Sequence, residues 1–132
     1  MKDIKWKILP LLIALLVFCN KSFAQNGIKS LTPQEYKQAI QNDPSAIVLD
    51  VRQPQEYKMG HIKGAILINV LDEPLFEQEI KKLDKNKTYY LYCRSGKRSN
   101  KAALKMQKMG FKVWELKGGI KSWTESKMPI EK

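Results

Sequence analysis

The chain of 132 residues has little cysteine and histidine: it contains two cysteines, Cys19 and Cys93, and one histidine. A structural zinc site needs about four such ligands, so two distant cysteines and one histidine exclude a zinc finger or a similar metal site. Six prolines and seven glycines are too few for a collagen-like or Pro/Gly-rich disordered chain, and 43% of the residues are hydrophobic. The sequence therefore predicts a globular protein with one domain.

The first 24 residues differ in composition from the rest of the chain. Three lysines precede an apolar run of 12 residues, 8–19, and small residues stand at positions 22 and 24. This order is typical of a secretory signal peptide, here cleaved after Ala24. The run is shorter than the 18 or so residues that cross a bilayer, so a cleaved signal is favoured over an uncleaved anchor. We predict an exported protein, periplasmic or secreted, whose mature chain, 25–132, has no stable membrane association.

Positive charge dominates the chain. The sequence has 24 Lys and Arg against 13 Asp and Glu, a net charge of +11. Cleavage after Ala24 removes four lysines and one aspartate, which leaves 20 basic and 12 acidic residues and a net charge of +8. Nucleic-acid-binding surfaces often interleave basic residues with clustered aromatic residues, and this chain lacks that pattern. We therefore expect no nucleic-acid partner.

Strand and helix patterns alternate along the mature chain. Runs rich in β-branched, aromatic or other apolar residues predict four strands: 46–51, 65–70, 88–93 and 112–116. Capping residues and helical spacing of apolar residues predict four helices: about 33–41, 74–83, 99–110 and a short one that holds Ile120 and Trp123. The polar residues 52–64 are predicted to form a loop. The alternation predicts an α/β fold, an open parallel sheet with helices on both faces.

Cys93 lies where the third predicted strand ends and a short polar loop begins. In open α/β sheets ligands bind beyond the carboxyl ends of the strands. A curled loop that leads into a helix can direct backbone N–H groups and the positive end of the helix dipole at the sulfur, and Arg94, Lys97 and Arg98 add three positive charges. Such surroundings favour the thiolate, the nucleophilic form of cysteine. A buried structural cysteine is the simpler alternative.

Four segments of the chain, in the same order, resemble the rhodanese family of sulfurtransferases, and the resemblance covers nearly all of residues 28–128. The segments are VLDVR at 48–52, EYKMGHIKGA at 56–65, YCRSGKRS at 92–99 and WELKGGIKSW at 114–123. The resemblance implies that Cys93 takes the outer sulfur of thiosulfate, or of a related small anionic donor, as a persulfide and gives it to a thiol or cyanide acceptor. It implies no metal and no organic cofactor, and we expect a monomer.

The loop after Cys93 supplies the expected substrate-binding residues. They are Arg94, Ser95, Gly96, Lys97, Arg98 and Ser99. Arg98, at the end of the loop, is the expected direct contact of the donor, whereas Arg94 and Lys97 attract it electrostatically or are merely solvated. The hydroxyls of Ser95 and Ser99 are expected to bind the sulfur, although Ser99 can equally cap the following helix.

Three residues outside the loop are expected to support the site. Asp50 and Arg52 stand at the end of a neighbouring strand and are interpreted as partners that brace the loop. His61, the single histidine, lies in the Gly-His-Ile-x-Gly-Ala stretch, which is a structural turn in the family that the chain resembles. We therefore predict that His61 is a hydrogen-bonded structural residue and not a general base.

Loop length separates sulfur transfer from the competing chemistries of this fold. Phosphatases that resemble rhodaneses carry Cys-x5-Arg, which here would place the arginine at position 99, where Ser99 stands. Arg98 gives the shorter loop, so a phosphatase or arsenate reductase is less favoured. An alternative from another class is a persulfide carrier, a sensor or a binding module without turnover, with Cys93 as the point of attachment.

Overall fold

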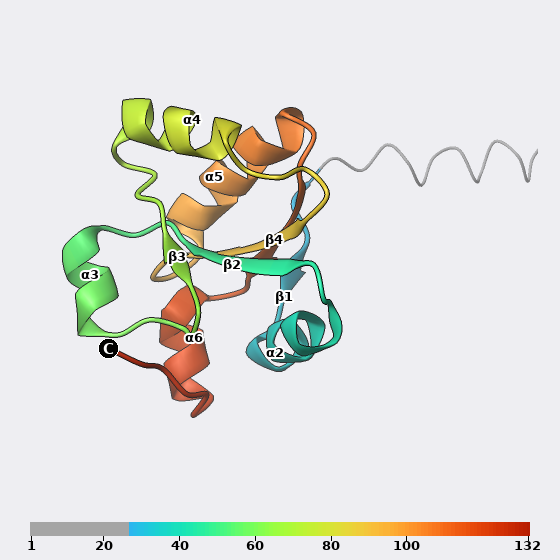
Figure 1. Ribbon diagram of the computed structural model, residues 1–132. Coiled ribbons are helices and arrows are strands. Elements are labelled where there is room, and N and C mark those ends of the chain that lie inside the picture. The colour runs from blue at the N-terminus through green and yellow to red at the C-terminus, as the bar shows by residue number, and fades with distance from the viewer. Residues whose placement is uncertain (1–26) are drawn as a thin grey trace, which may run out of the picture.

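The computed structural model describes residues 27–132, and the predicted signal peptide, 1–24, lies outside the described residues. One sheet of five parallel strands has the order β1-β5-β4-β2-β3 (Figure 1). The strands are β1 Ser30–Leu31, β2 Ala46–Asp50, β3 Ile66–Leu67, β4 Thr88–Tyr92 and β5 Lys112–Leu116. β4 is the central strand, so Cys93, which follows its carboxyl end, lies in the middle of the side of the sheet where the strands end.

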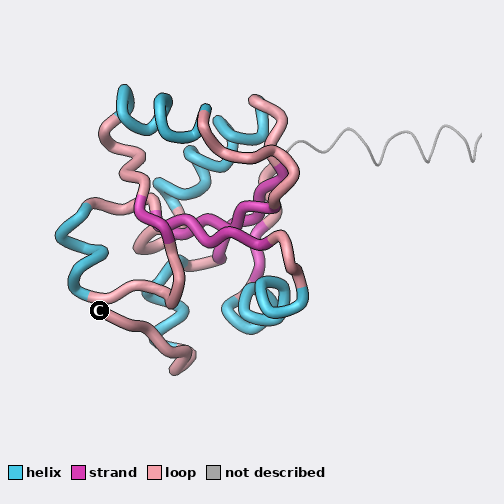
Figure 2. Tube along the Cα trace, viewed as in Figure 1, coloured by secondary structure: helices cyan, strands magenta, loops and turns pink. Residues whose placement is uncertain are grey.

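Helices cover both faces of the sheet, which confirms the predicted fold class. In the described part of the chain the helices are α2 Pro33–Asn42, α3 Pro54–Met59, α4 Glu73–Lys81, α5 Lys97–Lys108 and α6 Gly119–Glu125. α4 and α5 pack on one face and α2 and α6 on the other, while α3 lies beyond the end of β2 (Figures 1 and 2). None of these helices is long and apolar enough to span a membrane.

The central strand β4 sends its side chains alternately to two apolar layers. Leu91 packs in the layer beneath α4 and α5, and Cys93 follows on the same side. Tyr90 and Tyr92 pack in the layer beneath α2 and α6, which also contains Trp123. Because both faces are covered, this strand is buried along almost its whole length. Cys93 is thereby anchored by a rigid element.

α3 lies within residues 52–64, so the prediction of an uninterrupted loop there was wrong. Pro54 is the first residue of the helix, and Glu56 completes a capping box with Gln53. A proline at the first helical position is favourable because the N–H that it lacks would have no partner inside the helix. The helix buries none of its residues, so the apolar periodicity that reveals longer helices is missing from its sequence.

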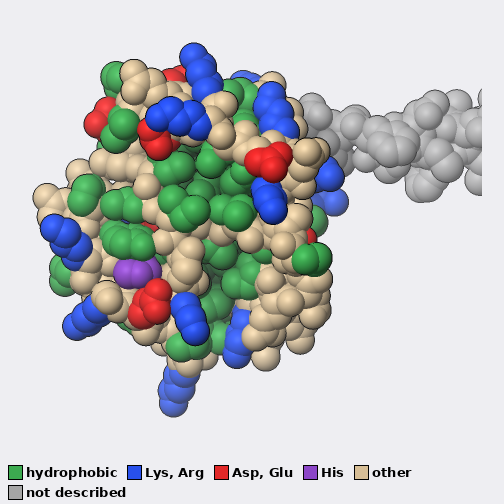
Figure 3. All heavy atoms as spheres, in the orientation of Figure 1, with side chains coloured by type: hydrophobic (Ala, Val, Ile, Leu, Met, Phe, Trp, Pro, Cys, Tyr) green, Lys and Arg blue, Asp and Glu red, His purple; other side chains and the backbone are tan. Residues whose placement is uncertain are grey.

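The edges of the sheet also differ from the prediction. β1 was not predicted, and β3 contains only Ile66 and Leu67 of the predicted strand 65–70. Beyond Leu67 the chain still follows the neighbouring strand, because the N–H of Ile68 donates to the carbonyl of Asp50 at 2.9 Å. β3 is an edge strand of the sheet, and its Ile66 is 48% exposed. Figure 3 shows hydrophobic side chains gathered across the middle of this face, with Lys and Arg around them.

Candidate active site

The thiol of Cys93 lies directly after the central strand and under the first turn of α5. Its side chain is 1% exposed and forms no disulfide. The N–H of Gly96 donates to Cys93 Sγ at 3.1 Å, so the chain curls back over the sulfur within three residues. Gly96 has a φ of 112°, a conformation that side chains disfavour. An N–H donor in this position stabilises negative charge on the sulfur.

The helix α6 holds the backbone of the Cys93 loop from the other side. The N–H groups of Ile120 and Lys121 donate to the carbonyls of Cys93 and Arg94 at 2.9 and 3.1 Å. Gly119 permits this approach: a Cβ there would lie 2.7 Å from the carbonyl oxygen of Cys93 and closer still to that of Arg94. The two carbonyls are therefore turned toward α6.

A buried ionic group lies at the end of β2, next to the loop. Arg52 donates to both carboxylate oxygens of Asp50, with Nη2 at 2.7 Å from Oδ2, and also to the carbonyl of Gly60 at 2.7 Å. Tyr92 donates its hydroxyl to Asp50 at 2.7 Å and accepts the N–H of Ile62. Burial and the Asp50 charge raise the pKa of Tyr92 well above its usual value, so the phenol remains a donor. This group ties β2, β4 and the turn after α3 together.

Arg98 pairs with a carboxylate that the sequence interpretation did not assign. Its Nη1 and Nη2 donate to the two carboxylate oxygens of Glu56 on α3, at 2.8 and 2.9 Å. These hydrogen bonds lower the pKa of Glu56 to about 2. They also raise the pKa of Arg98. Glu56 therefore partly neutralises the charge of the guanidinium.

The remaining loop residues divide into an exposed and a buried set. Arg94, Ser95 and Lys97 are exposed, whereas Ser99 is fully buried. The interpretation of Ser99 as a helix cap was wrong, since α5 begins at Lys97 with Gly96 as the residue that caps it. The N–H of Asn100 donates to the carbonyl of Gly96 at 3.0 Å, which is the first hydrogen bond of the helix, so Ser99 lies inside the first turn.

Ser99 instead binds a buried carboxylate behind the loop. Its hydroxyl lies 2.9 Å from Glu115 Oε1 and 3.2 Å from the carbonyl of Gly96. The other carboxylate oxygen of Glu115 accepts the hydroxyl of Ser30 at 2.8 Å. Glu115 is 3% exposed, and it anchors the first turn of α5 to β5. The sequence indicated this residue only as part of a strand.

His61 lies in the turn after α3 and joins it to the last residues of the chain. Its ring stacks on Tyr57 at 3.7 Å between centroids, and Nδ1 lies 2.9 Å from the carbonyl of Tyr57. Its backbone exchanges two hydrogen bonds with Glu131, both at 2.8 Å. Within residues 27–132, no group of three or more His, Cys, Asp and Glu side chains is placed to hold a metal ion.

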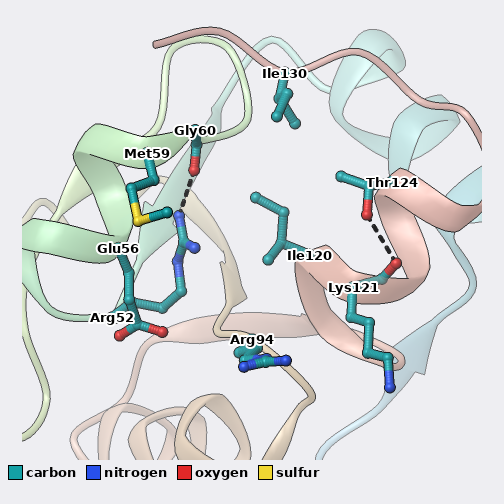
Figure 4. Close-up of a pocket in the computed structure, with 9 residues that line it drawn as sticks. All are labelled: Arg52, Glu56, Met59, Gly60, Arg94, Ile120, Lys121, Thr124 and Ile130. Atoms are coloured by element: carbon teal, nitrogen blue, oxygen red, sulfur yellow. Dashed lines mark hydrogen bonds between the residues drawn. The ribbon is translucent and has the colours of Figure 1, made fainter.

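A pocket of about 350 Å³ opens beside the loop. Figure 4 shows it between α3 and α6, with Arg94 at its base and Ile120 and Ile130 projecting into it. Its lining residues are Arg52, Glu56, Met59, Gly60, Arg94, Ile120, Lys121, Thr124 and Ile130. The site thus combines a buried, N–H-bonded thiol, a neighbouring basic loop and an open pocket at its side.

Comparison with known proteins identifies this arrangement. The family model described as the rhodanese-like domain matches residues 32–126. The chain belongs to the rhodanese-like family. A rhodanese-related protein from Thermoplasma volcanium has the same fold, with a TM-score of 0.70 and 29% identity over 78% of this chain and 97% of that one. The family that the sequence resembles is thus confirmed.

Curated relatives of this rhodanese-like chain have different names. YrkF, a candidate sulfur carrier protein of Bacillus subtilis, is 35% identical over 75% of this chain and 52% of its own length. A tRNA uridine(34) hydroxylase of Pelagibacter ubique is 33% identical over 93% of this chain and 39% of its own length. YtwF, a candidate sulfurtransferase of Bacillus subtilis, is 32% identical over 77% of this chain and 96% of its own length. The chain therefore spans about half, or less, of the first two relatives.

Proposed function

We propose that the protein is a sulfurtransferase that carries sulfane sulfur on Cys93. The observation that carries this proposal is the free, buried thiol at the end of the central strand, with the Gly96 N–H at 3.1 Å from its sulfur. The thiolate attacks the outer sulfur of thiosulfate, the S–S bond of thiosulfate breaks, and sulfite leaves; a related anionic donor loses its own thiolate or sulfinate in the same way. Cys93 then holds a persulfide. No metal or organic cofactor takes part.

The second half of the proposed reaction releases the sulfur. A thiolate or cyanide attacks the outer sulfur of the persulfide, the S–S bond to Cys93 breaks, and the Cys93 thiolate is restored. The acceptor leaves as a persulfide or as thiocyanate, so electrons balance without a further reagent. A hydrogen-bond donor such as the Gly96 N–H supports both steps, because the attacking sulfur and the leaving sulfur are both negatively charged.

The short loop supports sulfur transfer over phosphate chemistry. Arg98 is the fifth residue after Cys93, and Ser99, where a phosphatase would carry its arginine, is fully buried and bound to Glu115. The exposed cations Arg94 and Lys97 favour the approach of an anionic donor. We place the donor against this loop.

Intact-mass measurement tests the proposal. Residues 25–132 are incubated with thiosulfate and then with cyanide, beside Cys93→Ser as the variant without a thiol and Ser126→Ala as a control at an exposed serine outside the loop. The expected result is a gain of one sulfur atom that cyanide removes, absent from Cys93→Ser and present in Ser126→Ala. The same gain in Cys93→Ser, or thiocyanate production by it, would refute the assignment.

A second candidate function is a carrier without turnover. This alternative is specific because the chain matches 52% of YrkF, whose name is that of a sulfur carrier. A carrier would hold sulfur on the same thiol. A sulfur atom that is gained but resists cyanide and small thiols would favour the carrier. Both candidates fail if Cys93 takes no sulfur from thiosulfate, polysulfide or an organic persulfide.

We also propose that the protein acts outside the cytoplasm as a monomer, after cleavage at Ala24. The basic and apolar order of residues 1–24 supports export. N-terminal analysis of the protein purified from the periplasm or the medium is expected to begin at Gln25. A protein that keeps Met1 and stays with the cells would contradict export.

A further inference from the structure

Glu115 is a buried carboxylate behind the Cys93 loop that the proposed reaction does not use. It is 3% exposed, and within residues 27–132 the structure gives it no ion-pair partner. Its two oxygens instead accept the hydroxyls of Ser99 and Ser30, at 2.9 and 2.8 Å. Burial of a carboxylate is unfavourable unless such contacts offset it, and an apolar side chain would need none. A carboxylate here therefore indicates a role beyond filling the core.

The carboxylate of Glu115 lies against Gly96, the residue that binds the sulfur. A Cβ built on Gly96 would lie 3.1 Å from Glu115 Oε1, so the carboxylate occupies the space that a side chain of residue 96 would need. The N–H of the same glycine donates to Cys93 Sγ at 3.1 Å. Gly96 thus lies between the buried carboxylate and the thiol, and Glu115 limits its movement on the side of the missing Cβ.

Ser99 extends this contact to the first turn of α5. Its hydroxyl has one proton and two acceptors within reach, Glu115 Oε1 at 2.9 Å and the carbonyl of Gly96 at 3.2 Å. A carboxylate is the stronger acceptor, so the proton is donated to Glu115. The carbonyl of Gly96 then accepts the N–H of Asn100 at 3.0 Å, the first hydrogen bond of the helix. Glu115 therefore contacts the loop both at Gly96 and through Ser99.

We propose that Glu115 is a positioning residue for sulfur transfer, which acts on the Cys93 sulfur through Gly96. The inference rests on the proposed function of Cys93. Glu115 keeps the Gly96 N–H aimed at the sulfur while the sulfur carries negative charge, so loss of this alignment slows the attack on the donor. Binding of thiosulfate depends instead on the exposed cations of the loop, and we expect it to change little.

Sulfur uptake by two matched serine variants tests this role. Ser99→Ala removes the hydroxyl that binds Glu115. Ser45→Ala removes a hydroxyl that donates to the carboxylate of Asp43 at 2.7 Å, next to the start of β2 and so at the opposite end of the sheet from Cys93. The protein is mixed with thiosulfate at a series of concentrations, the reaction is quenched at intervals, and the sulfur gained by Cys93 is followed by intact mass.

The maximal rate and the half-saturating concentration of thiosulfate separate positioning from donor binding. Ser99→Ala is expected to lower the maximal rate by about threefold to tenfold, because one aligned hydrogen bond to a charged sulfur is weakened. Its half-saturating concentration is expected to change by less than about twofold. Ser45→Ala is expected to match the wild type in both, although it also loses a hydroxyl-to-carboxylate hydrogen bond.

Variants of Glu115 itself supply a rescue. Glu115→Ala removes the contacts with Ser99 and Gly96 together, so it is expected to slow uptake at least as much as Ser99→Ala. Glu115→Gln fills the same space and keeps a carbonyl oxygen for the Ser99 hydroxyl, so its maximal rate is expected to lie within about twofold of the wild type. Urea unfolding shows whether each variant is folded. If Glu115→Ala does not fold, the comparison of Ser99→Ala with Ser45→Ala decides.

The outcomes distinguish this inference from the proposed function. If wild-type Cys93 takes up no sulfur, the proposed function fails. If the wild type takes up sulfur and Ser99→Ala does so at the same rate, only the positioning role is overturned. Equal slowing by Ser99→Ala and Ser45→Ala would also overturn it, because the loss would then reflect stability alone. A loss in Ser99→Ala that high thiosulfate restores would overturn it as well, because the defect would lie in donor binding.

Discussion

Replacement of Gly119 by alanine tests whether α6 sets the geometry of the Cys93 loop. Gly119 has a φ of +65°, where an L side chain raises the energy by about 1–2 kcal/mol. The new Cβ would also press on the carbonyls of Cys93 and Arg94, both of which are backbone atoms that cannot rotate away. If α6 withdraws, the two hydrogen bonds from Ile120 and Lys121 are lost, at about 0.5–1.5 kcal/mol each. The expected loss of unfolding free energy is about 2–5 kcal/mol.

Gly64→Ala is a matched control for this substitution. Gly64 has a similar φ of +80°, and a Cβ there would meet nothing within 4 Å. It therefore carries the conformational penalty of about 1–2 kcal/mol alone. Urea unfolding, followed by circular dichroism, gives both losses under the same conditions. The excess for Gly119→Ala, about 1–3 kcal/mol, measures the contact between α6 and the loop.

The same two variants are then compared in sulfur uptake from thiosulfate, measured by intact mass at a temperature where both remain folded. Gly119→Ala is expected to load Cys93 more slowly because its loop carbonyls are no longer held by α6, and Gly64→Ala is expected to load at the wild-type rate. Equal losses of stability in the two variants, or a wild-type loading rate in Gly119→Ala, would refute the reasoning.

Two further predictions concern the ion pair of Arg98 and Glu56. Arg98→Ala is expected to raise the KM for thiosulfate by about twofold to fivefold at low ionic strength, because a cation is lost and Glu56 is left unpaired. The ratio to wild type should shrink with added salt, and an unaltered KM at low salt would argue against donor binding by Arg98. Arg98 also lowers the pKa of Glu56 to about 2, so the pair stabilises the folded protein above about pH 4.5, and this contribution is lost as the pH falls toward 2. The stability difference between wild type and Glu56→Gln, from urea unfolding, should therefore be constant near neutral pH and shrink in acid; a difference that does not change between about pH 6 and pH 3 would contradict this.

The sequence predicts the central part of the fold because its signals there are local. The apolar run 46–51 and the aromatic run 88–93 cover β2 and β4, and the capping box at Thr32 begins α2 where predicted. Cys93 is found as the thiol of interest because it ends a buried strand and precedes a basic loop. Elements whose residues bury little, such as α3, or pair over only two residues, such as β1, lack these signals.

The partners of the site residues could not be predicted from the sequence, because they depend on contacts between distant segments. Arg98 meets Glu56 across 42 positions, and Ser99 meets Glu115 across 16. Glu56 stood inside a motif that the resemblance identified, but its role follows only from the position of α3. Gly119 lies in the segment 114–123 that carries the resemblance, and the structure adds that it allows close contact with the loop.

The contact between α6 and the loop has a consequence for the order in which the protein is made. Cys93 and its loop are synthesised before Gly119, Ile120 and Lys121, which hold the loop carbonyls. Until those residues join the fold, the carbonyls of Cys93 and Arg94 lack the N–H groups that bind them. A nascent or truncated chain that ends before Gly118 can still contain β5, the neighbour of β4 in the sheet, but not the helix that holds the loop. Residues 118–132 thus complete the loop after every strand of the described sheet has been made.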